Sequence, residues 1–290
     1  MQVFCKKTVL LDLYSGTVQF PSECNISLSS IVYSMQAQDL IVSILVVTLS
    51  GALKLQFAYG FLGDHVPITE FAAAALIAYA AYAFDRGVEN KEDEKRGSRF
   101  RKTLLVTALI ATVGAFVFYP NPALLVPFLV AYLYAKGIGG YRLKGSRGMK
   151  NCIVALTWSL GILIFLGTFS LPVMLVCLFF FCKSFVNTVI YDVRDVDKDR
   201  SAGILTIPTA LSRTQVTALL LGLSLAAHAA VFGAYFTGII TGIDVLLISS
   251  IHSAFYIVAY CNRFEMFRNA LVDGEWILYT GYTILRDCVL

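Results

Sequence analysis

Long apolar runs separated by short polar connections make up most of the sequence beyond residue 40. A helix needs about 20 apolar residues to cross a bilayer, and most of the runs approach that length. They occupy residues 40–62, 67–88, 103–119, 121–137, 152–168, 171–191, 215–236, 239–260 and 272–287. This pattern predicts an all-α protein, a multi-pass membrane helical bundle of about nine transmembrane helices around a central apolar chamber.

Prolines and the N-terminal segment refine this division. The third and fourth runs are short for a bilayer and meet at Pro120 and Pro122. Because proline cannot continue a helix, we predict a hairpin that is broken at this point.

Residues 1–38 mix charged residues into a patchy apolar background, so we expect an N-terminal interfacial or loosely ordered arm before a transmembrane domain over residues 39–290.

Composition and charge exclude several classes of protein. The chain is 58% hydrophobic and only 14% charged, whereas soluble domains contain about 25% charged residues. The net charge of +4 is small and is mixed with acids, which predicts no nucleic-acid partner, and the seven cysteines show no CxxC spacing that would indicate zinc. The three histidines are isolated, and we assign them no functional role.

The distribution of basic residues predicts the orientation of the helices. Of the 23 Lys and Arg residues, 18 lie in the connections after the second, fourth, sixth and eighth runs, while the connections between these contain none. The positive-inside rule therefore places those four connections in the cytoplasm. We expect an integral, multi-pass membrane protein whose active-site loops lie on the cytoplasmic side.

Acidic residues concentrate after the second and the sixth runs. The first cluster spaces its carboxylates at i, i+4 and i+8, so on a continuing helix they would share one face, and the second cluster repeats the i, i+4 spacing. Like charges at this spacing destabilise an isolated helix unless a cation is present, and oxygen ligands beside a phosphate suit Mg²⁺. The predicted Mg²⁺ ligands are Asp85, Glu89, Asp93, Asp192, Asp195 and Asp199.

A mixed-charge loop after a helix can also be a solvated cap that holds the helix end out of the bilayer. Two matched clusters, four helices apart in order, favour a different interpretation. They predict one shared site in which a metal-bridged diphosphate lies between the ends of the second and the sixth helices, which must then come close together.

The segment NTVIYDVRDVDKDRSAGILTIPTAL resembles the second aspartate-rich motif of the UbiA superfamily of intramembrane prenyltransferases, and YAFDRGVENKEDE resembles the first. Ala81 stands where the first motif has Asn, and Glu89 replaces an Asp. The resemblance covers about residues 40–290 and implies a UbiA-like transmembrane prenyltransferase domain. It implies Mg²⁺-dependent transfer of a polyprenyl group from an isoprenyl diphosphate donor to a hydrophobic or aromatic acceptor within the membrane lipid, with release of pyrophosphate. The implied catalytic residues are Asp85, Glu89, Asp195 and Asp199.

The connection GYRLKGSRGMKN resembles the basic loop of this family, which closes over the diphosphate. In the sixth run, Lys183, Asn187 and Tyr191 form an i+4 stripe that leads into the second acidic cluster. Anchoring to lipid headgroups is the alternative role for each basic residue, and it is the one that we favour for Lys54. The residues predicted to bind the substrate diphosphate are Arg86, Lys144, Arg147, Lys150, Asn151, Lys183 and Asn187.

Two other functions stay open. A terpene cyclase of the same superfamily would use a double bond of the prenyl chain as the nucleophile and would need no acceptor. A membrane transporter would instead spread its charges near the bilayer midplane, whereas these acids cluster at one membrane face.

Overall fold

The computed structural model describes residues 28–88, 98–135, 148–201, 205–243 and 245–289. The chain divides into two compact units, Met1–Val42 and Ser43–Leu290, and the second unit carries the candidate site. The helices are α1 (Leu28–Phe61), α2 (Ile68–Gly87), α3 (Ser98–Phe118), η1 (Pro122–Leu125), α4 (Val126–Ala135), α5 (Met149–Leu166), α6 (Leu171–Arg194), α7 (Val196–Ser201), α8 (Ile207–Ala210), α9 (Arg213–Phe236), α10 (Leu246–Cys261), η3 (Asn269–Asp273) and α11 (Glu275–Val289).

The described part of the chain contains helices and connections and no strand, so the prediction of an all-α fold is confirmed. Six of these helices are long and apolar enough to cross a membrane, and two shorter apolar stretches, Pro122–Leu133 and Leu246–Cys261, lie where the fourth and eighth spans were predicted. The hairpin break is also confirmed, because the Asn121 side chain accepts a hydrogen bond of 2.9 Å from the Ala123 amide and caps the new helix.

The beginnings of two helices differ most from the prediction: α1 begins at Leu28 rather than at residue 40, and α10 begins later than expected. The eighth apolar run was expected to be helical from residue 239, but α10 begins at Leu246. The amides of Thr241 and Gly242 instead donate to the carbonyl of Phe61, at 3.1 and 3.2 Å, and hold the connection against the end of α1. These amides are therefore satisfied by α1 rather than by a helix of their own.

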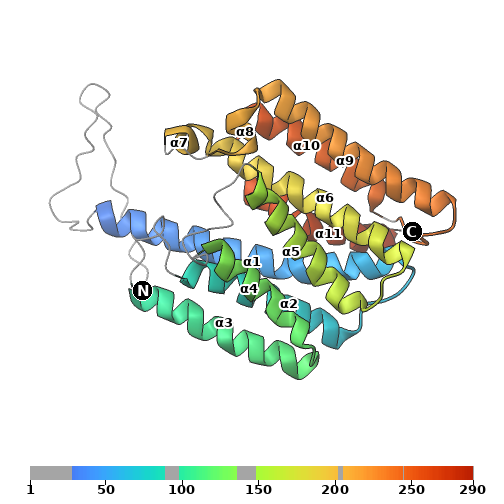
Figure 1. Cartoon of the computed structure of the whole chain (residues 1–290), viewed down its shortest axis with the longest axis horizontal. Coiled ribbons are helices and arrows are strands. Elements are labelled where there is room, and N and C mark those ends of the chain that lie inside the picture. The colour runs from blue at the N-terminus through green and yellow to red at the C-terminus, as the bar shows by residue number, and fades with distance from the viewer. Residues whose placement is uncertain (1–27, 89–97, 136–147, 202–204, 244, 290) are drawn as a thin grey trace. The chain divides into compact units, whose positions relative to one another are not determined.

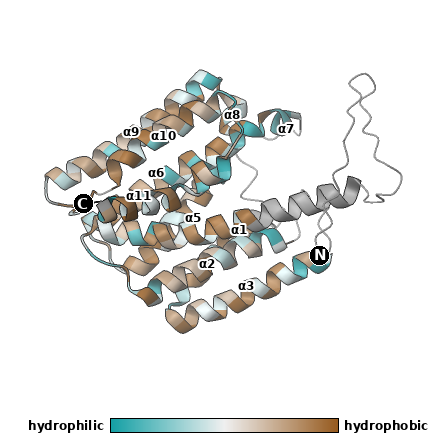
Figure 2. Cartoon of the chain, turned by 180° about the vertical axis from the view of Figure 1, so that it is seen from behind, coloured by the Kyte–Doolittle hydropathy of each residue, from teal (hydrophilic) through white to brown (hydrophobic). Residues whose placement is uncertain are grey.

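The helices of the second unit alternate in direction, so that α2 and α6 end where α3, α5, α9 and α11 begin (Figure 1). We call this the acidic end, defined by Asp85, Asp192, Asp195 and Asp199. Helix α2 packs against α3, α5 against α6, and α6 against both α9 and α10. Figure 2 shows hydrophilic residues at α7, while the long helices are mostly hydrophobic.

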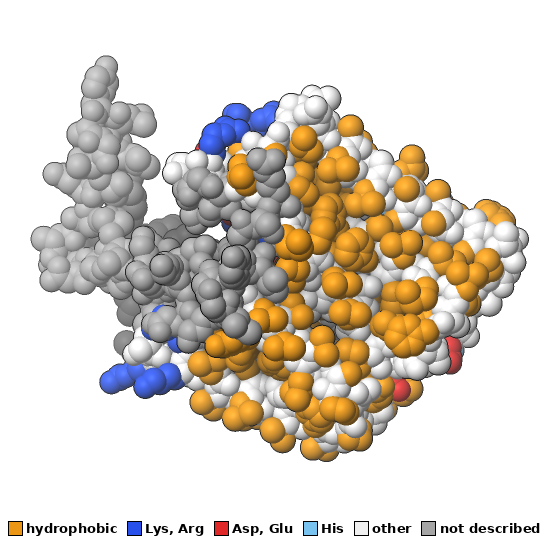
Figure 3. Space-filling model, in the orientation of Figure 1, with side chains coloured by type: hydrophobic (Ala, Val, Ile, Leu, Met, Phe, Trp, Pro, Cys, Tyr) orange, Lys and Arg blue, Asp and Glu red, His pale blue; other side chains and the backbone are white. Residues whose placement is uncertain are grey.

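The surface of α3 illustrates why the bundle is a membrane domain. Its buried residues are mostly small and recur at helical spacing on one face: Leu104, Ala108, Ala111 and Ala115. The other side of the helix exposes large apolar residues: Val106, Leu109, Ile110, Val113 and Val117. Hydrophobic side chains cover much of the face in Figure 3, and Lys and Arg side chains lie at its edge. The protein is therefore an integral, multi-pass membrane protein.

Aromatic rings fix α6 against its neighbours. The ring of Phe180 lies 4.9 Å from that of Trp276 on α11, and Phe57 of α1 lies 5.4 Å from the same indole. Phe179 contacts Phe61 edge to face at 5.5 Å. Such pairs stabilise a core beyond the burial of their area, so the position of α6, which carries the second acidic cluster, is set by α1 and α11.

Candidate active site

The end of α6 preserves the spacing of the second acidic cluster. The helix ends at Arg194, and Asp195 caps it with φ −91° and ψ 8°. A short helix follows at once, because the amide of Asp199 donates to the carbonyl of Asp195 at 2.8 Å. Asp195 and Asp199 therefore remain one helical turn apart, although the chain changes helix between Asp192 and Asp199. The side chain of Asp195 is 40% exposed and pairs with Arg194 at 3.0 Å.

Asp192 is held by the beginning of α5. Its side chain is only 2% exposed, and its two oxygens accept from Lys150 Nζ at 2.6 Å and from Asn151 Nδ2 at 2.9 Å. Gly148, with φ +69°, precedes the helix and allows this sharp beginning. Two predicted diphosphate ligands thus contact a predicted metal ligand, and together they join α5 to α6 at the acidic end.

The first acidic cluster begins on α2, which ends at Gly87 because Val88 is extended, with φ −68° and ψ 133°. The helix therefore ends between Asp85 and Glu89, in agreement with the predicted end of the second run at residue 88. A Cβ on Gly87 would approach the Leu105 side chain to 2.9 Å, so the close contact of α2 with α3 requires glycine here.

Asp85 and Arg86 lie in the last turn of α2. Arg86 Nε lies 3.7 Å from an Asp85 oxygen, and the Arg86 guanidinium lies 5.1 Å from the ring centroid of Tyr82. The other predicted residues of the two loops, Glu89, Asp93, Lys144 and Arg147, lie outside the described residues.

The ends of α2 and α6 lie on the same side of the bundle (Figure 1). Tyr82 and Tyr191 precede Asp85 and Asp195 by about one turn in these two helices. Within the described ranges, no three His, Cys, Asp or Glu side chains converge closely enough to hold a metal ion.

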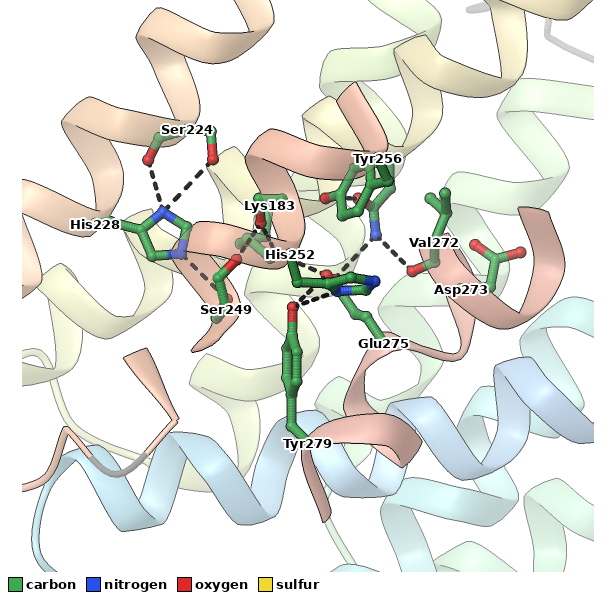
Figure 4. Close-up of polar contacts among 12 residues, drawn as sticks. Lys183, Ser224, His228, Ser249, His252, Tyr256, Val272, Asp273, Glu275 and Tyr279 are labelled. Atoms are coloured by element: carbon green, nitrogen blue, oxygen red, sulfur yellow. Dashed lines mark hydrogen bonds and ion pairs between the residues drawn. The ribbon is translucent and has the colours of Figure 1, made fainter. Parts of the chain in front are cut away.

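A buried polar network lies deeper in the bundle (Figure 4). Lys183 of α6 pairs with Glu275 of α11 at 2.6 Å and donates to Ser253 of α10 at 2.6 Å. The Asn187 amide donates to the other Glu275 oxygen at 3.1 Å, and Tyr279 donates to Glu275 at 3.2 Å. The predicted diphosphate ligands Lys183 and Asn187 therefore contact a carboxylate that lies outside the two acidic motifs.

Histidines extend this network without forming a metal site among the described residues. His228 contacts the Ser224 carbonyl at 2.7 Å and Ser249 Oγ at 3.1 Å, and His252 contacts the Tyr279 hydroxyl at 3.0 Å. These contacts engage both ring nitrogens of His228 and Nδ1 of His252, whereas His252 Nε2 is buried without a hydrogen-bond partner in the described part of the chain.

Tyr191 continues the stripe toward the acidic end. Its hydroxyl donates to Asp273 at 2.6 Å and contacts Asn269 Oδ1 at 3.1 Å, and the Arg268 guanidinium lies 4.7 Å from its ring centroid. Lys183, Asn187 and Tyr191 thus all face the segment from η3 to α11. Asp273 and Glu275 were the sequence feature that could have indicated this contact, because they are two acids at the beginning of an apolar run.

Comparison with known proteins identifies the fold. Neither the protein-family models nor the curated proteins contain a match to this sequence. The structure matches that of a UbiA homolog from Archaeoglobus fulgidus bound to Cd²⁺ with a TM-score of 0.57 and 14% identity, over 82% of this chain and 94% of that one. It matches the structure of a UbiA homolog from the same organism bound to GPP and Mg²⁺ with a TM-score of 0.53 and 13% identity, over 85% and 97% of the two chains.

A third structure, described for digeranylgeranylglyceryl phosphate synthase in membranes, matches with a TM-score of 0.50 and 16% identity, over 85% of this chain and 96% of that one. The chain therefore has the fold of UbiA homologs over most of its length, at low sequence identity. This confirms the fold that the two sequence motifs implied.

Proposed function

We propose that this protein is an intramembrane prenyltransferase that transfers a polyprenyl group from an isoprenyl diphosphate to a hydrophobic or aromatic acceptor and releases pyrophosphate. One observation carries the proposal. The chain has the fold of UbiA homologs, and its two acidic motifs begin at the ends of α2 and α6, which lie on the same side of the bundle. A UbiA homolog with this fold was solved with GPP and Mg²⁺.

The donor chemistry at the acidic end fits Mg²⁺. This ion prefers oxygen ligands and is usually held by one or two carboxylates together with substrate phosphates and water. Asp85 and Asp195 keep partly exposed carboxylates at the two helix ends, with Asp199 one turn beyond. We propose these three, together with Glu89, Asp93 and Asp192, as the ligands. Bound Mg²⁺ would stabilise the charge that develops on the leaving diphosphate.

The remaining residues would position the substrate. Lys150 and Asn151 fix the beginning of α5 against Asp192, and the connection directly before α5 carries Lys144 and Arg147. This anchor supports the proposal that the basic connection closes over the diphosphate at the acidic end. Positively charged donors placed there would neutralise the leaving group.

The interior of the bundle would keep water away from the reaction. The side chains of Phe179, Phe180 and Trp276 are buried between α1, α6 and α11. An allylic carbocation is protected from hydrolysis in such apolar surroundings, and aromatic faces stabilise positive charge. We propose that the prenyl chain is held among these helices.

The test is turnover by the purified protein in detergent or nanodiscs. Isoprenyl diphosphates of several lengths would be supplied with Mg²⁺, with and without aromatic and lipid acceptors, and both pyrophosphate and prenylated products would be measured. We expect pyrophosphate release that depends on an acceptor. Cyclic hydrocarbons or alcohols formed without an acceptor would overturn the transferase in favour of a terpene cyclase, and absence of turnover with every donor would contradict both.

A further inference from the structure

Arg268 is a buried cation in the connection between α10 and α11. Arg268 belongs to the segment that faces the end of α6. The residue is only 9% exposed. The guanidinium stacks on Tyr191, with 4.7 Å between the guanidinium carbon and the ring centroid. Tyr191 lies one turn before Asp195, so Arg268 lies beside the second acidic motif.

Within the described residues, this guanidinium has no ion pair, and its Nε is buried without a hydrogen-bond partner. The nearby carboxylate of Asp273 accepts the Tyr191 hydroxyl at 2.6 Å instead. A buried charge that lacks a partner destabilises a folded protein, and an arginine fork presents five donors in one plane. The structure therefore keeps a costly group in a position where an oxyanion would satisfy it.

The backbone on both sides of Arg268 is unusual. Phe267, directly before it, has φ +58°, a left-handed conformation that is rare for a non-glycine residue. Directly after it, residues Asn269–Asp273 form a π-helix, which occurs often at functional sites. The hydrogen bonds of the Tyr191 hydroxyl with Asn269 and Asp273 hold this segment against α6.

The predicted diphosphate ligands are largely engaged elsewhere. Lys150 and Asn151 bind Asp192, and Lys183 and Asn187 bind Glu275. Lys144 and Arg147 belong to the connection before α5, so a cation on the side of α6 that faces η3 would add a donor from another direction. Arg268 is a buried cation on that side whose donors are not taken up by the described residues.

We propose that Arg268 binds a phosphate oxygen of the isoprenyl diphosphate donor, from the connection between α10 and α11. This inference rests on the proposed function, because it assigns a ligand to the same site. Tyr191 positions the guanidinium by stacking, and the planar fork offers paired hydrogen bonds to one phosphate group, a geometry that lysine cannot reproduce.

The test is binding of a non-reactive thiolodiphosphate analogue of the donor, with Mg²⁺, by calorimetry in detergent. We expect Arg268→Gln to weaken binding about tenfold to a hundredfold, as for a lost charge-assisted hydrogen bond, with Arg268→Lys intermediate. Arg263→Gln is the matched control, since Arg263 is an exposed arginine with φ +68° in the same connection. It should bind within about twofold of wild type.

Melting temperatures separate this role from a packing role. Without ligand, Arg268→Gln should melt at or above the wild-type temperature, because the substitution removes an unpaired buried charge. Unchanged affinity in Arg268→Gln, or a large fall in its ligand-free melting temperature, would overturn the inference and leave the proposed function intact. If the wild-type protein binds no analogue, or if Asp195→Asn binds it as tightly as wild type does, the proposed function itself fails.

Discussion

Lys183 and Glu275 form an ion pair of 2.6 Å between α6 and α11, with 2% and 0% of their side chains exposed. Each partner also makes hydrogen bonds, Lys183 to Ser253 and Glu275 to Asn187 and Tyr279. Isolated charges are costly inside a membrane domain. The two charges therefore neutralise each other inside the bundle, and the hydrogen bonds satisfy their remaining donors and acceptors. Removal of either residue would leave the other as an uncompensated buried charge.

Glu275→Ala should destabilise the protein by about 3–5 kcal/mol, because it leaves the Lys183 ammonium buried without its counter-charge. The measurement is unfolding of the detergent-solubilised protein by heat or denaturant. The double variant Lys183→Met/Glu275→Leu removes both charges and should recover most of the loss. Wild-type stability in Glu275→Ala would show that water or another group compensates Lys183.

Asp195→Asn should lower turnover at least about a hundredfold while the melting temperature stays near that of wild type. The carboxylate is partly exposed and contributes little packing, but it is a proposed metal ligand. Asp197→Asn is the control, since Asp197 lies in the same acidic segment with a fully exposed side chain that contacts Arg200 at 3.9 Å. Equal activity of the two variants would remove Asp195 from the metal site.

Lys150 and Asp192 should be energetically coupled in catalysis. If Lys150 acts by holding Asp192, the effects of Lys150→Ala and Asp192→Asn on kcat/KM will not add, and the coupling energy will be about 0.5–3 kcal/mol. The measurement is a double-mutant cycle on four purified proteins. Additive effects would instead indicate that Lys150 contacts the diphosphate directly, as the sequence predicted.

Gly242→Ala should destabilise the protein by about 1–3 kcal/mol, because a Cβ at this position would lie 2.1 Å from the carbonyl oxygen of Gly60. Gly222→Ala on α9 is the matched control, since a Cβ there meets nothing within 4 Å. Alanine is favoured over glycine in a helix by about 0.8–1.0 kcal/mol, so Gly222→Ala should raise the melting temperature. A neutral Gly242→Ala would mean that the connection after α9 moves away from α1 at little cost.

The fold was predictable because a membrane helix can be recognised from the length and hydropathy of its sequence. The break at Pro120 was also predictable from the local sequence, since proline lacks the backbone donor that a helix requires. The beginning of α10 was not, because the amides of Thr241 and Gly242 bind a carbonyl about 180 residues earlier in the chain, and no local pattern encodes that contact.

The candidate site was predictable only in part. Helical spacing correctly indicated that Lys183, Asn187 and Tyr191 share one face of α6, but spacing does not identify what that face contacts. The partners Glu275 and Asp273 come from the beginning of the last helix. The end of α2 at Gly87, by contrast, lies within one residue of the predicted end of the second apolar run.

The Lys183–Glu275 pair also constrains how the chain is synthesised. Glu275 follows Lys183 by 92 residues, which corresponds to about 5–18 s of translation at about 5–20 residues per second. During this interval the ammonium has entered the bilayer while its counter-ion is still on the ribosome, a state that costs about 2.5–3.5 kcal/mol at the centre of a membrane helix. Nascent α6 must therefore be retained by the insertion machinery, or paired with water or lipid headgroups, until the last helix arrives.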